Sequence, residues 1–210
     1  MKHSISPASI PPTPPRSVGL LIAAGFGRRF DPSGMVSKLE TLLDGTMVAV
    51  RTAQALLMHC DQVIAAVRPE STGLAAALEA AGCEIAVVTG AEGMGTSIAC
   101  GARLAASQSM PGIVLIQPAD MPWLAPESVR AVVQARSPAN ELIVVPTYHG
   151  KDGHPVRFDC SLLPDLSRLS GEHGARRLLL QHPAHRMTVD DAGVVRDLDS
   201  PQDLHPQALR

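Results

Sequence analysis

The stretch SVGLLIAAGFG, residues 17–27, decides how this 210-residue chain is interpreted. Its first eight residues form a mostly apolar run, which is typical of a strand buried on both faces of a parallel sheet. Glycines follow this run directly, and glycine lets a backbone turn sharply and approach a ligand closely. Because ligands of open parallel sheets bind at the carboxyl ends of the strands, we expect a buried first strand that ends in a ligand-binding turn.

Short apolar runs alternate with helical patterns along the chain as far as residue 148. Strands are predicted at residues 17–24, 62–67, 84–89, 112–117 and 141–148. Helices are predicted at residues 47–59, 71–82, 95–107 and 125–136. Because the apolar runs are continuous and helices separate them, the pattern predicts an α/β fold: a single-domain, mainly parallel, doubly wound sheet of the Rossmann-like type.

The two ends of the chain are less regular. Residues 149–158 predict a small β-hairpin region, residues 171–182 a helix, residues 185–198 two short strands around 191–193, and residues 200–209 a closing helix. Residues 1–16 contain five prolines, which are typical of an extended, disordered tail. We therefore expect one domain over residues 17–210, without an internal repeat or a second domain.

The composition argues against several classes of protein. Hydrophobic residues make up 45% of the chain and aromatic residues only 2%, so the core must be aliphatic. A formal net charge of -2 argues against a nucleic-acid-binding protein, which usually carries a basic excess. The four cysteines form no CxxC pair, and no apolar run approaches the roughly 20 residues of a membrane span. We expect a cytoplasmic protein with reduced cysteines that binds neither membrane nor nucleic acid.

The glycine turn after the first strand is the first candidate site. Backbone N–H groups at Gly25 and Gly27 are suited to bind phosphate, and Arg29 and Lys38 add positive charge. The GxGxxG dinucleotide fingerprint is not met, because Phe30 occupies the place of its last glycine, and no GKS/T phosphate loop is present. The alternative is a surface turn whose arginines are solvated.

Two acidic segments are candidates for a metal site. Asp120 comes at the tip of the strand predicted at 112–117, where a carboxylate is well placed to hold Mg²⁺ beside a phosphate. Asp199, or Asp197 in its place, follows another predicted strand and could complete the site. The alternatives are an ordinary turn aspartate and a helix cap, since Ser200 precedes Asp203 by three residues.

Two further segments carry polar residues at turns. Gly93 and Gly95 lead into a predicted helix with Ser97 in its early turn, which suggests either a ligand-facing helix start or a simple cap. His154 and Pro155 form a rigid polar elbow that could contact a second substrate, although a loop histidine is more often merely exposed.

Taken together and in order, these motifs resemble the molybdenum cofactor nucleotidyltransferases. The resemblance is carried by residues 23–38, 93–101, 120–122, 153–155, 171–176 and 197–203. It is closest to the cytidylyltransferase branch, because the guanylyl branch typically has glycine where this chain has Ala24 and lacks the Gly-His-Pro of residues 153–155. A methyl group at Ala24 that narrows the base pocket toward a pyrimidine is one physical interpretation. The chain departs from the family in a longer loop between Arg29 and Lys38 and in Glu172, which replaces an aspartate.

The resemblance implies a Mg²⁺-dependent enzyme that transfers CMP from CTP to molybdopterin and releases pyrophosphate. The implied partners are CTP, the molybdenum cofactor, and a recipient molybdoenzyme or its chaperone. Two alternatives stay open. One is guanylyl or other nucleotidyl transfer to a sugar or polyol phosphate, and the other is a non-catalytic chaperone that binds the molybdenum cofactor.

The resemblance also implies roles for individual residues. Nucleotide binding is expected from Ala23, Ala24, Gly25, Gly27, Gly93, Met94 and Ser97. Catalytic roles are expected for Arg29, Lys38 and Asp120, metal binding for Asp120 and Asp199, and acceptor binding for His154 and Pro155.

Overall fold

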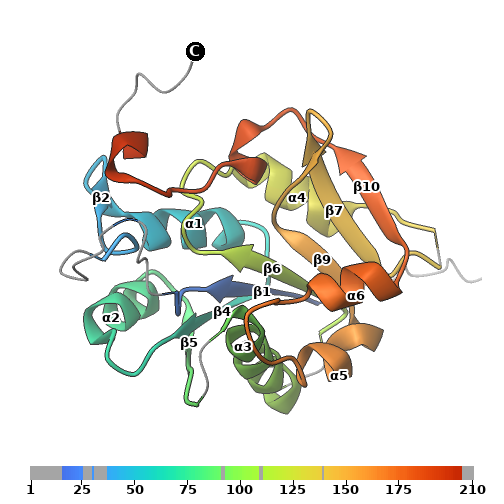
Figure 1. The fold of residues 1–210 in the computed structure, drawn as a ribbon, viewed down its shortest axis with the longest axis horizontal. Helices are drawn as coiled ribbons and strands as arrows, with labels where there is room; N and C mark the ends of the chain where they lie inside the picture. Colours follow the sequence, from blue (N-terminus) through green and yellow to red (C-terminus); the bar gives the residue numbers. More distant parts are fainter. Residues whose placement is uncertain are drawn as a thin grey trace, which may run out of the picture.

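The computed structural model describes residues 16–25, 30, 37–90, 93–108, 111–138 and 140–204. Within them an eight-stranded sheet lies between two layers of helices (Figure 1). Its strands are β1 (Ser17–Ile22), β4 (Gln62–Val67), β5 (Glu84–Val87), β6 (Ile113–Pro118), β7 (Ile143–Tyr148), β8 (Lys151–Asp152), β9 (Val156–Asp159) and β10 (Ala184–Thr188). The strand order is β10-β7-β9-β6-β1-β4-β5, and β8 pairs with β7.

The parallel part of the sheet contains a topological switch point. Strands β6, β1, β4 and β5 are neighbours in this order and all run parallel. The chain passes from β1 through β4 to β5 on one side, and then returns to the other side of β1 with β6. This reversal opens a crevice at the carboxyl ends of β1 and β6, where open α/β sheets bind ligands. The predicted fold class is confirmed.

The predicted hairpin region contributes to the main sheet in a way that the sequence did not indicate. The turn after β7 returns as the short antiparallel strand β8. Strand β9 then inserts between β6 and β7 and runs antiparallel to both. Strand β10 closes this side of the sheet parallel to β7.

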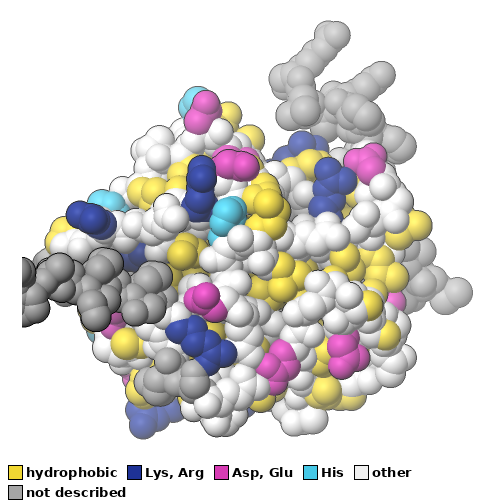
Figure 2. Space-filling view, turned by 180° about the vertical axis from the view of Figure 1, so that it is seen from behind, with side chains coloured by type: hydrophobic (Ala, Val, Ile, Leu, Met, Phe, Trp, Pro, Cys, Tyr) yellow, Lys and Arg dark blue, Asp and Glu magenta, His cyan; other side chains and the backbone are white. Residues whose placement is uncertain are grey.

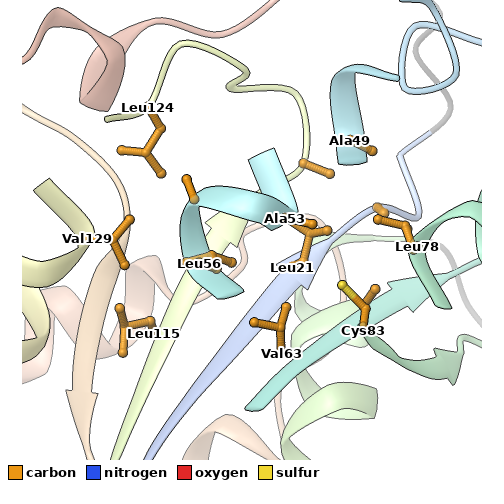
Figure 3. Packing of buried hydrophobic residues seen from close by; sticks show 14 of the residues in the cluster. Leu21, Ala49, Ala53, Leu56, Val63, Leu78, Cys83, Leu115, Leu124 and Val129 are labelled. Carbon is orange, nitrogen blue, oxygen red and sulfur yellow. The ribbon is translucent and has the colours of Figure 1, made fainter. Parts of the chain in front are cut away.

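The helices cover both faces of the sheet and divide the core in two. Helices α1 (Val48–Leu57), α2 (Thr72–Ala80) and α4 (Pro126–Gln134) pack on one face, where Figure 3 shows their aliphatic side chains meeting those of the strands. Helices α3 (Met94–Gln108), α5 (Leu163–Leu166) and α6 (Arg176–Gln181) pack on the other face. Leu20 and Leu21 are both 0% exposed, yet they belong to opposite clusters, because successive side chains of a strand point to opposite faces. The continuous apolar run of β1 therefore follows from its burial on both faces.

Two further features concern the surface. No helix within the described ranges has both the length and the apolar character needed to cross a membrane. Figure 2 shows acidic and basic side chains interspersed over one face, so the described residues there form no continuous basic stripe.

The prediction of two strands over residues 185–198 is wrong in its second half. Only β10 forms, and residues 192–195 make a 3-10 turn. The carboxylate of Asp191 accepts hydrogen bonds from the backbone N–H of Gly193 (2.8 Å), the N–H of Ala125 (3.0 Å) and the hydroxyl of Ser128 (2.7 Å). These bonds turn the chain and tie it to the start of α4, so a second strand cannot extend there.

The remaining differences are short elements. The closing helix is a 3-10 turn over Pro201–Leu204, and residues 205–209 of that prediction lie outside the described residues. A two-stranded ribbon of β2 (Leu42–Leu43) and β3 (Thr46–Met47), the 3-10 turn over Cys160–Leu162 and helix α5 were not predicted. Residues 1–15 lie outside the described residues, so the tail and the domain limits remain predictions.

A half-buried arginine completes the carboxyl end of α4. Nη1 of Arg157, on β9, donates to the backbone oxygens of Val132 (3.1 Å), Val133 (3.2 Å) and Ala135 (2.7 Å). The last carbonyls of a helix have no partner within it, and a cation there also interacts favourably with the helix dipole. Burial lowers the pKa of the Arg157 guanidinium, and the nearby carboxylate of Asp159 opposes this effect.

Replacement of Arg157 by methionine is expected to lower the free energy of unfolding by about 2 kcal/mol, because three carbonyls lose a charged donor. Urea unfolding measures this change. The matched control is Arg51→Met, which breaks an exposed ion pair with Asp44 at 3.0 Å and is expected to change stability by less than about 1 kcal/mol. Equal effects of the two substitutions would contradict the assigned role of Arg157.

Candidate active site

A cavity of about 560 Å³ opens at the carboxyl ends of β1, β4, β5 and β6. It is lined by Ile22, Ala24, Gly25, Arg68, Pro69, Glu70, Val88, Thr89, Gly90, Gly93, Met94, Ser97, Pro118, Asp120 and Glu172. The cavity thus lies beside the switch point of the sheet, where the topology favours a ligand site.

An ion pair between Lys38 and Asp120 stands at the β6 end of this cavity. Nζ of Lys38 lies 2.5 Å from Oδ2 of Asp120, and the two side chains are only 15% and 19% exposed. The turn that carries Asp120 is held on both sides. The N–H of Ala119 donates to the oxygen of Ile22 (3.0 Å), and the hydroxyl of Thr52, on α1, donates to the oxygen of Ala119 (3.0 Å). The carboxylate is therefore placed by β1, β6 and α1 together.

A second acidic segment runs beside this pair. The N–H of Leu198 donates to the backbone oxygen of Asp120 (2.8 Å), which brings residues 197–199 next to it. Burial raises the pKa of Asp197, the negative charges of Asp199 and Asp120 raise it further, and Lys38 lowers it. Asp197 therefore lies within electrostatic reach of the ion pair. Among the described residues, no three His, Cys, Asp or Glu side chains form a cluster able to hold a metal ion.

The capping interaction considered for this segment is also present. The carboxylate of Asp203 accepts from the N–H (2.7 Å) and the hydroxyl (2.9 Å) of Ser200 and from the N–H of Asp199 (3.2 Å). These hydrogen bonds lower the pKa of Asp203. Asp203 is thus the capping residue, while Asp197 and Asp199, on either side of the buried Leu198, are both exposed.

The start of α3 is held by the loop over residues 170–174. Gly93 has a φ of +130°, and a Cβ placed on it would lie 2.4 Å from the backbone carbon and oxygen of Gly171. The N–H of Gly95 donates to that same oxygen (2.8 Å). The hydroxyl of Ser97 donates to the oxygen of Gly93 (3.3 Å). Only glycine fits at residue 93, because two backbones are in direct contact there.

A smaller cavity of about 170 Å³ adjoins the first. It is lined by Met94, Ile98, Ile116, His154, Val156, Phe158, His173, Ala175, Arg176 and Leu179. Met94 lines both cavities, and it is 42% exposed. Nδ1 of His154 lies 3.3 Å from the oxygen of Ile116, and burial lowers the pKa of the imidazole, so His154 is neutral near pH 7.

The structure brings most of the predicted site residues together. The large cavity is lined by Ala24, Gly25, Gly93, Met94, Ser97 and Asp120, and Lys38 contacts Asp120. Ala23 is buried, and its N–H donates to the oxygen of Ala66 (2.9 Å), so it extends the sheet and does not line the cavity. His154 lines the smaller cavity, while Pro155 is buried and lines neither. Gly27 and Arg29 lie outside the described residues.

Other residues of the site were not singled out from the sequence. Arg68 and Glu70 line the large cavity, and Nη1 of Arg68 lies 3.3 Å from Oε1 of Glu70. They directly follow the strand predicted at 62–67, so the rule that selected Asp120 also applied to them. Thr52 supports the turn of Asp120 from the middle of a helix, where no sequence signal distinguishes it from a core residue.

The parallel sheet, its switch point and the charged cavity beside it are typical of α/β proteins that bind a ligand at the carboxyl ends of their strands. Residues 19–187 match the family model described as the MobA-like NTP transferase domain, and the chain belongs to this family of nucleotidyltransferases.

Three proteins of similar length resemble this chain over most of its residues. The purine catabolism protein PucB of Bacillus subtilis (strain 168) is 29% identical over 204 residues, which are 90% of this chain and 94% of PucB. The crystal structure of Rv0371c from Mycobacterium tuberculosis H37Rv has a TM-score of 0.73 at 25% identity, over 90% of this chain and 95% of that one. Rv0371c has also been solved in complex with manganese, with a TM-score of 0.65 at 24% identity over 83% and 88% of the chains. A nucleotidyl transferase from Methanothermobacter shares the fold, with a TM-score of 0.74 at 18% identity over 90% and 94% of the chains.

Proposed function

We propose that this protein transfers the CMP group of CTP to the terminal phosphate of molybdopterin and releases pyrophosphate. The observation that carries this proposal is the Lys38–Asp120 pair at the edge of the 560 Å³ cavity, at the switch point of a nucleotidyltransferase fold. Ala24, which lines that cavity, and the Gly-His-Pro of residues 153–155 support the cytidylyl and molybdopterin assignments.

The acidic residues fit a divalent metal ion. Mg²⁺ prefers oxygen ligands and is commonly held by one or two carboxylates together with substrate phosphates. The backbone bond from Leu198 to Asp120 brings the acidic segment beside this carboxylate, and the negative charge of Asp120 helps to raise the pKa of Asp197. A cation held between the two segments would offset this repulsion. We therefore propose that Mg²⁺ is held by Asp120 and Asp199, with Asp197 as the alternative second ligand. The manganese complex of Rv0371c supports a divalent metal ion in this family. A bound metal ion would offset the charge of the triphosphate.

The reaction requires positioning more than proton transfer. A phosphate monoester has a second pKa of about 6, so the acceptor phosphate is largely a dianion at pH 7 and attacks without a strong general base. Its oxygen forms a bond to the α-phosphorus of CTP, and the bond from the α-phosphorus to the bridging oxygen of pyrophosphate breaks. Lys38 would offset the charge that develops at the α-phosphate. Arg29 and the backbone of residues 24–27 would hold the outer phosphates, and Ser97 the ribose or base.

The smaller cavity supports an acceptor with a flat ring. Its walls combine apolar side chains, among them Phe158 and Ile116, with the neutral imidazole of His154 and the guanidinium of Arg176. Such a surface suits a heterocycle that carries polar edges and an anionic group. A sugar or polyol phosphate offers little apolar surface to these walls. The cavity therefore favours molybdopterin as the acceptor, with His154 on its ring side and Pro155 holding the elbow.

The test is release of pyrophosphate with Mg²⁺ present. CTP and GTP are each combined with molybdopterin, with a sugar phosphate or with a polyol phosphate. We expect release with CTP and molybdopterin at least about tenfold faster than with any other combination. Faster release with GTP would indicate guanylyl transfer, and release with a sugar or polyol phosphate would indicate another acceptor. Binding of molybdopterin without any release would indicate a chaperone.

A further inference from the structure

The strand order of the sheet gives a measure of where the nucleobase lies in the large cavity. Lys38 and Asp120 stand at the end of β6, and the next two strands are β1 and β4. Neighbouring strands are about 4.8 Å apart, so the ends of β6 and β4 are separated by roughly 10 Å. This separation is comparable to the one that the ribose imposes between the α-phosphate and the base of a nucleotide. If the phosphates lie at β6, as the proposed function requires, the base lies over the ends of β4 and β5.

The end of β4 carries a second pair of charged side chains. Arg68 and Glu70 both line the cavity, with Nη1 of Arg68 3.3 Å from Oε1 of Glu70 and side-chain exposures of 25% and 63%. The N–H of Ser71 donates to the backbone oxygen of Arg68 (3.1 Å), which turns the chain just after the pair. Val88 and Met94 line the same cavity from the end of β5 and the start of α3. The base end of the cavity is thus lined by a guanidinium, an adjacent carboxylate and apolar side chains.

We infer that Arg68 and Glu70 recognise the edge of the base and select cytosine over uracil. A guanidinium can donate two parallel hydrogen bonds, and a carboxylate only accepts. Cytosine presents two neighbouring acceptors, O2 and N3, followed by the N4 amino donor. Uracil has a donor at N3, which would face the guanidinium, and an acceptor at O4, which would face the carboxylate. CTP and UTP have nearly the same size and shape, so this hydrogen-bonding pattern is what can distinguish them.

The test compares binding of CTP, UTP and GTP to the full chain with Mg²⁺ present, by titration calorimetry. The wild type is expected to bind CTP at least about tenfold more tightly than UTP, since a matched pair of base contacts contributes about 1–3 kcal/mol. Arg68→Met and Glu70→Gln are each expected to lower this ratio at least about fivefold. Glu70→Gln gives the more specific prediction. Its amide N–H can donate to O4 of uracil, so UTP itself should bind more tightly to this variant than to the wild type.

The matched controls are Arg51→Met and Asp44→Asn. These residues form another arginine–carboxylate pair, at 3.0 Å, that does not line either cavity, so both variants should keep the wild-type ratio. Equal binding of CTP and UTP by the wild type, tighter binding of GTP than of CTP, or an unchanged ratio in both site variants would overturn the inference. Failure of all three nucleotides to bind would instead overturn the proposed function. Circular dichroism of each variant verifies the fold, and of the two site residues the more exposed Glu70 is less able to disturb it.

Discussion

Replacement of Asp120 by asparagine is expected to slow pyrophosphate release by at least about a thousandfold while the protein stays folded. Asparagine has nearly the same shape but no charge, so it cannot pair with Lys38 or hold a divalent metal ion as a carboxylate does. The backbone of this turn is held by the oxygen of Ile22 and the hydroxyl of Thr52, and the substitution leaves both contacts in place. The chemistry is therefore expected to suffer far more than the fold.

Two measurements separate these effects. The rate of pyrophosphate release at saturating CTP reports the chemistry, and urea unfolding reports the fold. Asp44→Asn, at an exposed aspartate outside both cavities, should change neither. If Asp120→Asn lost stability in proportion to activity, Asp120 would be a structural residue and the metal assignment would fail.

The parallel part of the fold could be predicted because its signal is local. Each strand of that part is a continuous apolar run, and residues such as Leu20 and Leu21 need only be buried on opposite faces to produce it. Asp120 and Arg68 each follow such a strand, so their place at the ligand edge of the sheet is a consequence of the strand itself. The strand pattern thus placed one member of each charged pair at this edge, although Asp120 was selected from the sequence and Arg68 was not.

The other features of the fold and of the site depend on contacts between segments that are distant in the sequence. Strand β9 enters the sheet between β6 and β7. The sequence of its four residues does not indicate which strands it pairs with. Ala23 looks like part of the phosphate-binding turn until its N–H is seen to continue the pairing of β1 with β4. The turn over residues 192–195 forms because Asp191 accepts a hydrogen bond from the N–H of Ala125, which lies 66 residues earlier in the chain and immediately before α4. Sequence patterns report burial and local conformation, and they do not report which partners meet.

The contact between Gly193 and Trp123 predicts a second large effect. A Cβ on Gly193 would lie 2.1 Å from the backbone oxygen of Trp123 and 2.5 Å from its carbonyl carbon. Backbone atoms cannot rotate away as a side chain can, so one of the two segments must move. Gly193 is buried, and its N–H is also bonded to Asp191 (2.8 Å), which resists that movement. Gly193→Ala is therefore expected to lower the free energy of unfolding by about 3 kcal/mol or more.

The same substitution should impair catalysis. Trp123 is three residues after Asp120, and Gly193 is four residues before Asp197, so the contact holds together the two segments that carry these carboxylates. Displacement of either segment would change the spacing of the carboxylates, and the rate of pyrophosphate release should fall at least about tenfold in the fraction that remains folded. Gly73→Ala is the matched control. Its Cβ would meet only Oε1 of the flexible side chain of Glu40 at 3.2 Å, and alanine favours the helix there, so stability should stay unchanged or rise. A Gly193→Ala protein with wild-type stability and rate would show that this contact does not hold the two acidic segments together.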